Sequence, residues 1–233
     1  MTILRDNEIL VRRTAGLSSH SEGDLPGKTG VGVVEERGDQ IRDCAIGDRV
    51  AWTGVVAQDT ATVQEHLFVR VPDGIDDNVA LYTGVVGYAF QAIRASDLTF
   101  GEQVMVSGNG LIASVVSRAV SIFGLRLLSL SAINKGEHID GIFVCPGEHN
   151  IADAAGYLRP KATVVVLGQA DIALLLAGLE DKKITLVYPG EPGPEAAGVC
   201  HPRAYMRWTV RDDMELFFKL LMENRISVEG LRG

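Results

Sequence analysis

Two glycines separated by one residue carry the clearest chemistry in the chain. Gly108, Asn109 and Gly110 come directly after a short apolar run at residues 104–106. Gly108 permits a tight turn, and Gly110 leaves room for a ligand to approach the backbone closely. Where such a turn opens a helix, unpaired N–H groups and the positive end of the helix dipole attract a phosphate. The pattern therefore predicts an anion-binding turn.

The elements around this turn strengthen that prediction. Residues 104–106 predict a buried strand, and apolar residues recur at helical spacing between residues 111 and 123. Ala113 stands where a third glycine is common and still lets the helix pack closely on the strand. Strand, turn and helix predict the first unit of a dinucleotide-binding sheet. The same glycines would also be expected if they served only the turn, so both interpretations stay open.

The rest of the chain predicts two kinds of sheet. Short β-rich stretches before residue 80 predict a small barrel, followed by a helical pattern at 77–95. Strands alternating with helices after residue 103 predict a five-stranded parallel sheet covered on both faces. The β-rich stretches are 8–12, 29–36, 46–52 and 61–69; the later strands are 125–131, 141–145, 162–168 and 183–188; the later helices are 151–158 and about 212–224.

Composition excludes several classes of function. The formal net charge of the 233 residues is −8 and no basic stripe is present, which argues against a nucleic-acid partner. No apolar run reaches membrane-spanning length, and the first ten residues are charged too early for a secretory signal. The three cysteines, Cys44, Cys145 and Cys200, form neither a metal-type pair nor an even disulfide set. We therefore expect a cytoplasmic protein with neither a nucleic-acid nor a membrane partner.

The order of these segments resembles the medium-chain dehydrogenase/reductase superfamily, the alcohol dehydrogenase-like proteins. Residues 17–22 and 205–209 are more particularly similar to the dehydrogenase half of two-domain bacterial oxidoreductases. The resemblance implies a truncated GroES-like barrel domain at 1–88, a reduced Rossmann-like domain at 89–204, and a C-terminal helix at 205–233 that returns to the first domain. The pieces that match the superfamily are 32–36, 46–50, 71–74, the glycine turn and 158–160.

Departures from the superfamily pattern predict a protein without zinc. The positions of the usual cysteine and histidine ligands hold Ser18 and Lys28, and Thr29 replaces the neighbouring glutamate. A protonated lysine cannot bind zinc, and serine is a poor ligand beside a thiolate. The four-cysteine structural lobe is missing as well. A helix–strand–helix segment that would flank a bound adenine is also absent between Ser131 and Gly141.

The nucleotide prediction rests on the residues after the second strand of the sheet. An NAD site usually has a carboxylate there for the ribose 2′-hydroxyl. This chain has Ser131, with Lys135 shortly after it, and these two would hold the 2′-phosphate of NADP(H). The alternative is that neither residue touches a nucleotide because none binds. The resemblance implies that the nicotinamide would lie between the two domains of this chain, near Thr83 and residues 145–147.

The resemblance also implies a substrate cleft with candidate catalytic residues. A histidine beside a carboxylate can act as a general base, and a lysine can hold an anion or stabilise an oxyanion. His20 would equally be a solvated loop residue, and Tyr82 would equally serve helix packing. The candidate catalytic residues are Ser18, His20, Glu22, Lys28 and Tyr82, with His66 expected in the same region.

These observations support three predictions of function. The leading one is a zinc-independent NADP(H)-type oxidoreductase acting on a small polar intermediate of a biosynthetic pathway. The alternative is a non-redox enzyme, catalysing elimination or cyclisation, on a scaffold that has lost its nucleotide site. The third is a non-catalytic partner subunit. The edge strand near residues 184–187 predicts a homodimer, or a heterodimer with a related chain.

Overall fold

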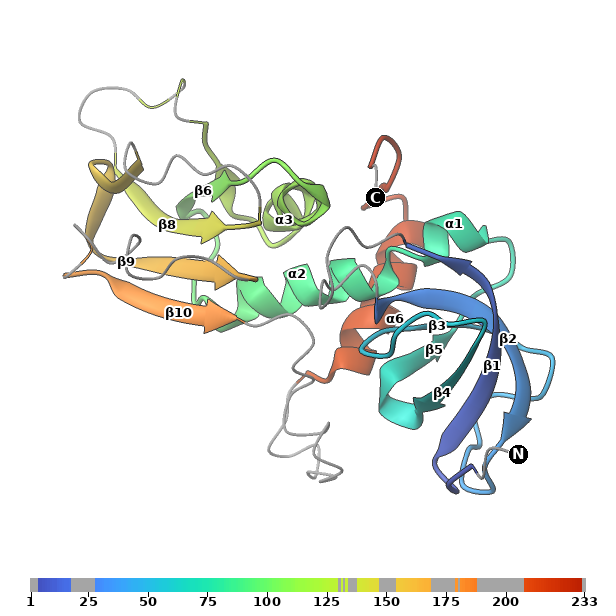
Figure 1. Cartoon of the computed structure of the whole chain (residues 1–233). Helices are drawn as coiled ribbons and strands as arrows, with labels where there is room; N and C mark the ends of the chain where they lie inside the picture. Colours follow the sequence, from blue (N-terminus) through green and yellow to red (C-terminus); the bar gives the residue numbers. More distant parts are fainter. Residues whose placement is uncertain are drawn as a thin grey trace. The chain divides into compact units, whose positions relative to one another are not determined.

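The computed structural model describes residues 4–17, 28–129, 131, 133, 138–146, 154–168, 179, 181–187 and 208–231. The chain divides into two compact units, mainly 1–88 with 190–228 (unit 1) and 89–189 with 229–232 (unit 2). Unit 1 holds an antiparallel sheet and unit 2 a parallel one, each of five strands (Figure 1). The predicted α/β class, a GroES-like half-barrel with a Rossmann-like sheet, is confirmed.

Unit 1 is built on a curved antiparallel sheet whose strands lie in the order β4-β1-β2-β3-β5 (Figure 1). All five strands contribute buried apolar residues to one core, and Trp52 and Phe68 are among the largest fully enclosed side chains. The strands are β1 (Glu8–Gly16), β2 (Gly30–Arg37), β3 (Arg49–Trp52), β4 (Thr60–Gln64) and β5 (Phe68–Arg70). The short helix α1 (Asp77–Ala80) follows, and α2 (Thr83–Ala95) continues into unit 2.

The helix α6 (Val210–Met222) packs on the β5 side of this sheet. It begins with a capping box in which the Thr209 and Asp212 side chains satisfy each other's backbone N–H groups. Arg211 then lies over the Phe68 ring at 5.7 Å and pairs with Asp43. Apolar residues on one face of α6, together with this cation–π contact, hold the helix on the sheet.

One predicted strand of unit 1 is wrong in its length. Residues 61–69 do not form a single strand, because β4 ends at Gln64 and the 3₁₀ turn η2 (Glu65–Leu67) separates it from β5. β4 pairs with β1, whereas β5 pairs with β3 at the opposite edge. The chain must therefore cross the sheet at this point, and a local apolar pattern carries no information about that crossing.

Unit 2 contains a parallel sheet in the order β10-β9-β8-β6-β7. The arrows labelled β6, β8, β9 and β10 run in one direction in Figure 1, and α3 (Leu111–Ile122) buries one apolar face in the unit. The strands are β6 (Gln103–Ser107), β7 (Arg126–Leu127), β8 (Ile139–Val144), β9 (Leu158–Leu167) and β10 (Lys183–Val187). Nearly continuous buried runs in β8 and β9 fit a sheet with both faces covered.

Two predictions for unit 2 are corrected. The second strand was expected at 125–131, but β7 covers only Arg126 and Leu127, because the chain leaves β6 after Leu128. The predicted helix at 151–158 does not reach Leu158, where β9 starts. Pro160 lies in an irregular part of β9, where the pairing with β8 shifts register and Lys161 has φ +62°. Proline lacks the N–H that a regular ladder needs, so it is confined to such positions.

Candidate functional site

Gly108 forms a turn that no other residue would tolerate, directly after β6. Its φ is +120°, a conformation that favours glycine. A Cβ there would lie 2.8 Å from the Cys145 carbonyl oxygen and 3.0 Å from that of Pro146. The glycine is therefore required by backbone conformation and also by the close approach of the chain that follows β8.

Gly110 is required for neither reason. Its φ of −91° is open to any residue, and a Cβ would meet only the Pro146 carbonyl oxygen, at 3.7 Å. It is the N-cap of α3 and, as a glycine, supplies no side-chain cap to that helix end. The first N–H groups of α3 have no intrahelical partner, so this exposed helix start has the donors and the dipole that suit a phosphate.

The residues beside Gly110 are also compatible with phosphate binding at the start of α3. Asn109 is exposed beside it, while Ala113 is buried in the first turn of α3. A small residue at 113 lets the helix start pack close to β6, as expected from the sequence. The residues at this turn fit the pyrophosphate of a dinucleotide: an open approach at Gly110, an uncapped helix start and no acidic side chain in the first turn.

The described residues that follow β7 offer hydroxyl groups and no carboxylate. Ser129 and Ser131 are both exposed, and their Oγ atoms are 3.1 Å apart. Ser131 lies four residues beyond the end of β7, so it does not end the strand as predicted. Lys135 lies outside the described residues. The hydroxyl pair is placed after β7, on the side where a ribose is held in Rossmann-like sheets.

Pro146 and Cys145 continue β8 towards the same turn. Cys145 is fully buried, and its N–H donates to the Ser107 carbonyl at 2.8 Å. Burial raises the pKa of its thiol to about 12, so it remains protonated and unreactive near neutral pH. Cys145 therefore contributes backbone geometry to the site and no nucleophile.

In unit 1 the candidate residues Lys28 and Tyr82 flank, in the sequence, two segments that come into contact at Gly84. A Cβ on Gly84, in the first turn of α2, would lie 2.7 Å from Thr53 Oγ1 and 3.1 Å from Thr29 Cγ2. The start of β2 and the start of α2 are thus in close contact. Both Lys28 and Tyr82 are partly exposed next to this contact.

Thr83 and Thr53 behave differently from each other in this cluster. Thr83 is fully buried, and its hydroxyl donates to the Ala80 carbonyl, so a ligand would have to compete with that bond. Thr53 is 6% exposed and lies against the start of α2. Thr53 could not be predicted from the sequence, because nothing in its neighbourhood along the chain marks it. Gly84, a helix-disfavouring residue at a helix start, was the available signal.

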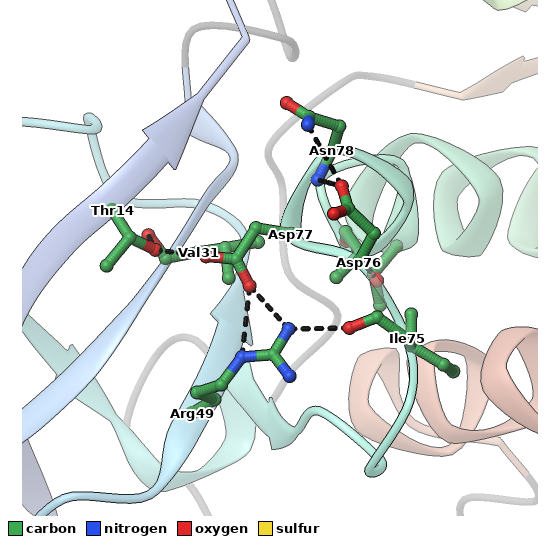
Figure 2. Close-up of polar contacts among 9 residues, drawn as sticks. Thr14, Val31, Arg49, Ile75, Asp76, Asp77 and Asn78 are labelled. Carbon is green, nitrogen blue, oxygen red and sulfur yellow. Dashed lines mark hydrogen bonds and ion pairs between the residues drawn. The ribbon is translucent and has the colours of Figure 1, made fainter.

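A polar network fixes the start of α1, which precedes Tyr82 and Thr83 in the sequence (Figure 2). Arg49 of β3 donates to the Asp77 carboxylate from Nε at 3.0 Å, and to the Ile75 carbonyl at 2.6 Å. Thr14 of β1 donates to the same carboxylate at 2.6 Å. Partial burial alone would raise the pKa of Asp77, but the bonds from Thr14 and Arg49 and the Arg49 charge lower it overall.

His66 occupies η2 and is partly buried. Its Nε2 atom is enclosed and has no hydrogen-bond partner in the described part of the chain. Burial lowers the pKa of the imidazole, which therefore favours the neutral form at physiological pH. The expectation that it faces the candidate catalytic residues stays a prediction.

Three candidate catalytic residues, Ser18, His20 and Glu22, lie outside the described residues. Within the ranges that the structure describes, no group of histidine, cysteine, aspartate or glutamate side chains is arranged to hold a metal ion. No helix in those same ranges is long and apolar enough to cross a membrane.

The fold is that of known oxidoreductases. Quinone oxidoreductase from Pseudomonas syringae pv. tomato DC3000 matches at 16% identity with a TM-score of 0.70, over 99% of this chain and 84% of that one. Escherichia coli quinone oxidoreductase, solved in complex with NADPH, matches at 13% identity with a TM-score of 0.68, over 98% and 84%. Alcohol dehydrogenase TADH from Thermus sp. ATN1 matches at 14% identity with a TM-score of 0.69, over 97% and 85%.

Comparison with protein-family models gives no match, and comparison with curated protein sequences gives none either. The resemblance to the medium-chain dehydrogenase/reductase superfamily is confirmed at the level of the fold. At these identities the structural likeness does not extend to activity.

Proposed function

We propose that the protein is a zinc-independent NADP(H)-dependent oxidoreductase acting on a small polar intermediate of a biosynthetic pathway. The observation that carries this proposal is the turn at Gly108–Gly110, with its open approach and the uncapped start of α3. A helix start of this kind binds pyrophosphate in dinucleotide sites. Support also comes from the fold, since one protein that shares it was solved with NADPH.

Different residues of the chain would bind the cofactor and the substrate. Backbone N–H groups of the turn and of the start of α3 would hold the pyrophosphate, and Ser129 and Ser131, with Lys135, would hold the 2′-phosphate. Bound NADPH would supply the hydride. Lys28 and Tyr82, with the loop residues Ser18, His20 and Glu22, are the proposed group for orienting the substrate and donating a proton.

A fluorescence titration tests the proposal. NADPH added to folded protein should show enhanced and blue-shifted emission with saturation, and 2′,5′-ADP should compete with it. NADH should bind more weakly, because Ser129 and Ser131 present hydroxyls where an NAD site has a carboxylate. Absence of NADPH binding at millimolar concentration, in protein that circular dichroism shows to be folded, would reject the redox function.

A non-redox enzyme is the second candidate, and one observation favours it. β7 has only two residues, and no carboxylate follows it among the described residues up to position 133. The carboxylate that usually binds the ribose in an NAD site is therefore missing from these residues. The turn at Gly108–Gly110 would then bind an anion such as phosphate that leaves during elimination or ring closure.

Ser131→Asp separates the two candidates. In an NADP(H) enzyme the new carboxylate would repel the 2′-phosphate, lowering NADPH affinity and favouring NADH. In a non-redox enzyme the exposed position would tolerate the change, and activity would stay as it was. Lys28→Ala should abolish activity under both proposals and serves as the positive control.

We further propose a dimer formed through β10. This strand pairs with β9 on one side and, in the described part of the chain, is the last strand of its sheet. An unpaired edge is a template for another strand, which a second copy or a related chain would supply. Light scattering coupled to size-exclusion chromatography should give twice the mass of the chain, and a monomer at high concentration would contradict this.

A further inference from the structure

Pro146 is seated between two glycines at the carboxyl end of the parallel sheet. β8 lies between β6 and β9, and Val144 of β8 pairs with Val166 of β9. Pro146 and Gly168 each lie two residues after this pair, and a Cβ on Gly168 would lie 3.0 Å from the Pro146 Cγ atom. On the other side, a Cβ on Gly108 would lie 3.0 Å from the Pro146 carbonyl oxygen. The proline fits because both neighbouring residues lack a side chain.

The position of Pro146 matters because its carbonyl oxygen faces the glycine turn. This oxygen is 3.0 Å and 3.7 Å from the Cβ positions of Gly108 and Gly110, respectively. No residue in the described ranges donates a hydrogen bond to it. Pro146 is partly exposed, whereas Cys145 before it is fully buried. From Cys145 to Pro146 the chain therefore passes from the core to a partly exposed position next to the proposed pyrophosphate site.

We infer that Gly168 is a positioning residue for this site, acting through Pro146. By leaving space for the proline ring, Gly168 keeps Pro146 at the correct distance from the glycine turn. The inference rests on the proposed NADP(H) function and adds to it a residue that lies 60 positions from Gly108 in the sequence. It also specifies which half of the cofactor is affected.

The sheet order identifies that half. β8 and β9 lie on one side of β6, and β7 lies on the other. In doubly wound sheets the two halves of a dinucleotide lie on opposite sides of the first strand, with the adenosine half over the strand that follows it in sequence. Disturbing Pro146 should therefore weaken contacts to the nicotinamide half and leave the adenosine half unchanged.

The first test is Gly168→Ala, measured as binding of NADPH and of 2′,5′-ADP. The added methyl must displace Pro146 by a few tenths of an ångström, and we expect the Kd of NADPH to rise about three- to tenfold. The Kd of 2′,5′-ADP, which lacks the nicotinamide half, should stay within error of wild type. The emission maximum of bound NADPH should also shift, because it reports the surroundings of the nicotinamide.

Gly74→Ala is the matched control for backbone strain. Gly74 has the same φ as Gly168, +83°, but a Cβ there would meet nothing within 4 Å. The control variant carries the conformational cost of alanine without a clash, and it lies in unit 1 outside the proposed site. Its affinity for NADPH should equal that of wild type.

The decisive measurement asks whether Pro146→Ala restores the NADPH affinity that Gly168→Ala lowers. Pro146→Ala removes the ring atoms that the new methyl would meet, so adding Gly168→Ala to that background should change the NADPH Kd by less than about twofold. Independent effects of equal size in both backgrounds would overturn the inference, as would a folding defect of Gly168→Ala that Pro146→Ala does not repair. If wild type binds NADPH and Gly168→Ala binds it equally, the inference fails while the proposed function stands. If wild type binds neither ligand, both fail.

Discussion

The two ends of the parallel sheet in unit 2 are built from different chemistry. At the amino end, Arg159 lies 3.0 Å from both the Glu102 and the Asp140 carboxylates. Asp140 also accepts the Gln103 N–H at 2.6 Å. At the carboxyl end the described residues form no ion pair, and the contacts there involve glycines, Pro146 and backbone carbonyls.

This difference separates stability from binding within one sheet. Charged side chains at the amino end fix the first residues of β6, β8 and β9 against one another. The carboxyl end has no such pairs in the described ranges. The first N–H groups of α3 at that end are available to a ligand because Gly110 supplies no side-chain cap. Ligands of open α/β sheets bind outside the carboxyl ends of the strands, which agrees with this division. Changes at the two ends should therefore affect different measurements.

The largest effect is expected from Asp140→Ala. The change removes the acceptor for the Gln103 N–H and one partner of Arg159, and charged hydrogen bonds of this kind contribute about 2–3 kcal/mol. Urea denaturation should show that loss of free energy of unfolding. Lys183→Ala, which breaks an exposed pair with Asp97 near the same end, should cost less than about 1 kcal/mol. Equal losses for the two variants would contradict the role given to Asp140.

At the other end, Gly110→Ala should separate binding from stability. Its methyl would enter the open approach to α3, and we expect NADPH to bind about tenfold more weakly, or about 1.4 kcal/mol. The free energy of unfolding should fall by about 1 kcal/mol or less, since alanine caps a helix somewhat worse than glycine. Gly156→Ala, with no atom near its Cβ position, is the control. A large loss of stability with unchanged binding would reverse the comparison.

Asp77→Asn tests whether a charged network matters in unit 1 as well. The folded-state pKa of Asp77 is lowered, so its contribution is complete above the unfolded pKa of about 3.9 and disappears as pH falls through the folded value. Because both partners are partly exposed, we expect less than about 1 kcal/mol at pH 7. Denaturation of wild type and variant at pH 7 and pH 3 should show the difference shrinking in acid. A difference that grows in acid would contradict the assignment.

The smallest effect is expected at Cys145. With no exposed surface and a pKa of about 12, its thiol should resist alkylation at pH 8 in the folded protein. Mass spectrometry after iodoacetamide treatment should find residue 145 unmodified in native protein and modified in urea. Rapid native labelling would mean that the carboxyl end of β8 opens, and the distances at Pro146 would then need revision.

Local patterns predicted the centre of the fold well. The run from β6 through Gly108 to α3 was expected within one or two residues, because burial, turn and helix spacing are all encoded by neighbours in sequence. The pieces predicted less well have ends that depend on distant partners. β7 stops when it leaves β6, and the break between β4 and β5 exists because the two strands join opposite edges of their sheet.

The candidate site shows the same division. The sequence alone identified Gly108, Gly110 and Ala113, since all three lie in one short segment whose glycine spacing and helical pattern can be recognised locally. Gly108 is required by its own φ, and Ala113 is buried in the first turn of its own helix. Thr53 and Gly168 were not identified, because each acts on a residue from another element. Those contacts follow from how the strands are paired.

By itself the sequence determined that a strand, a glycine turn and a helix start would meet at one point, since these depend on backbone conformation and apolar spacing along a short segment. Only the tertiary structure decided that Gly168 faces the Pro146 ring. That contact follows from the pairing of Val144 with Val166, which places residues two positions further along each strand against each other. Register between parallel strands is set by the packing of the whole sheet, so no local pattern could have shown it.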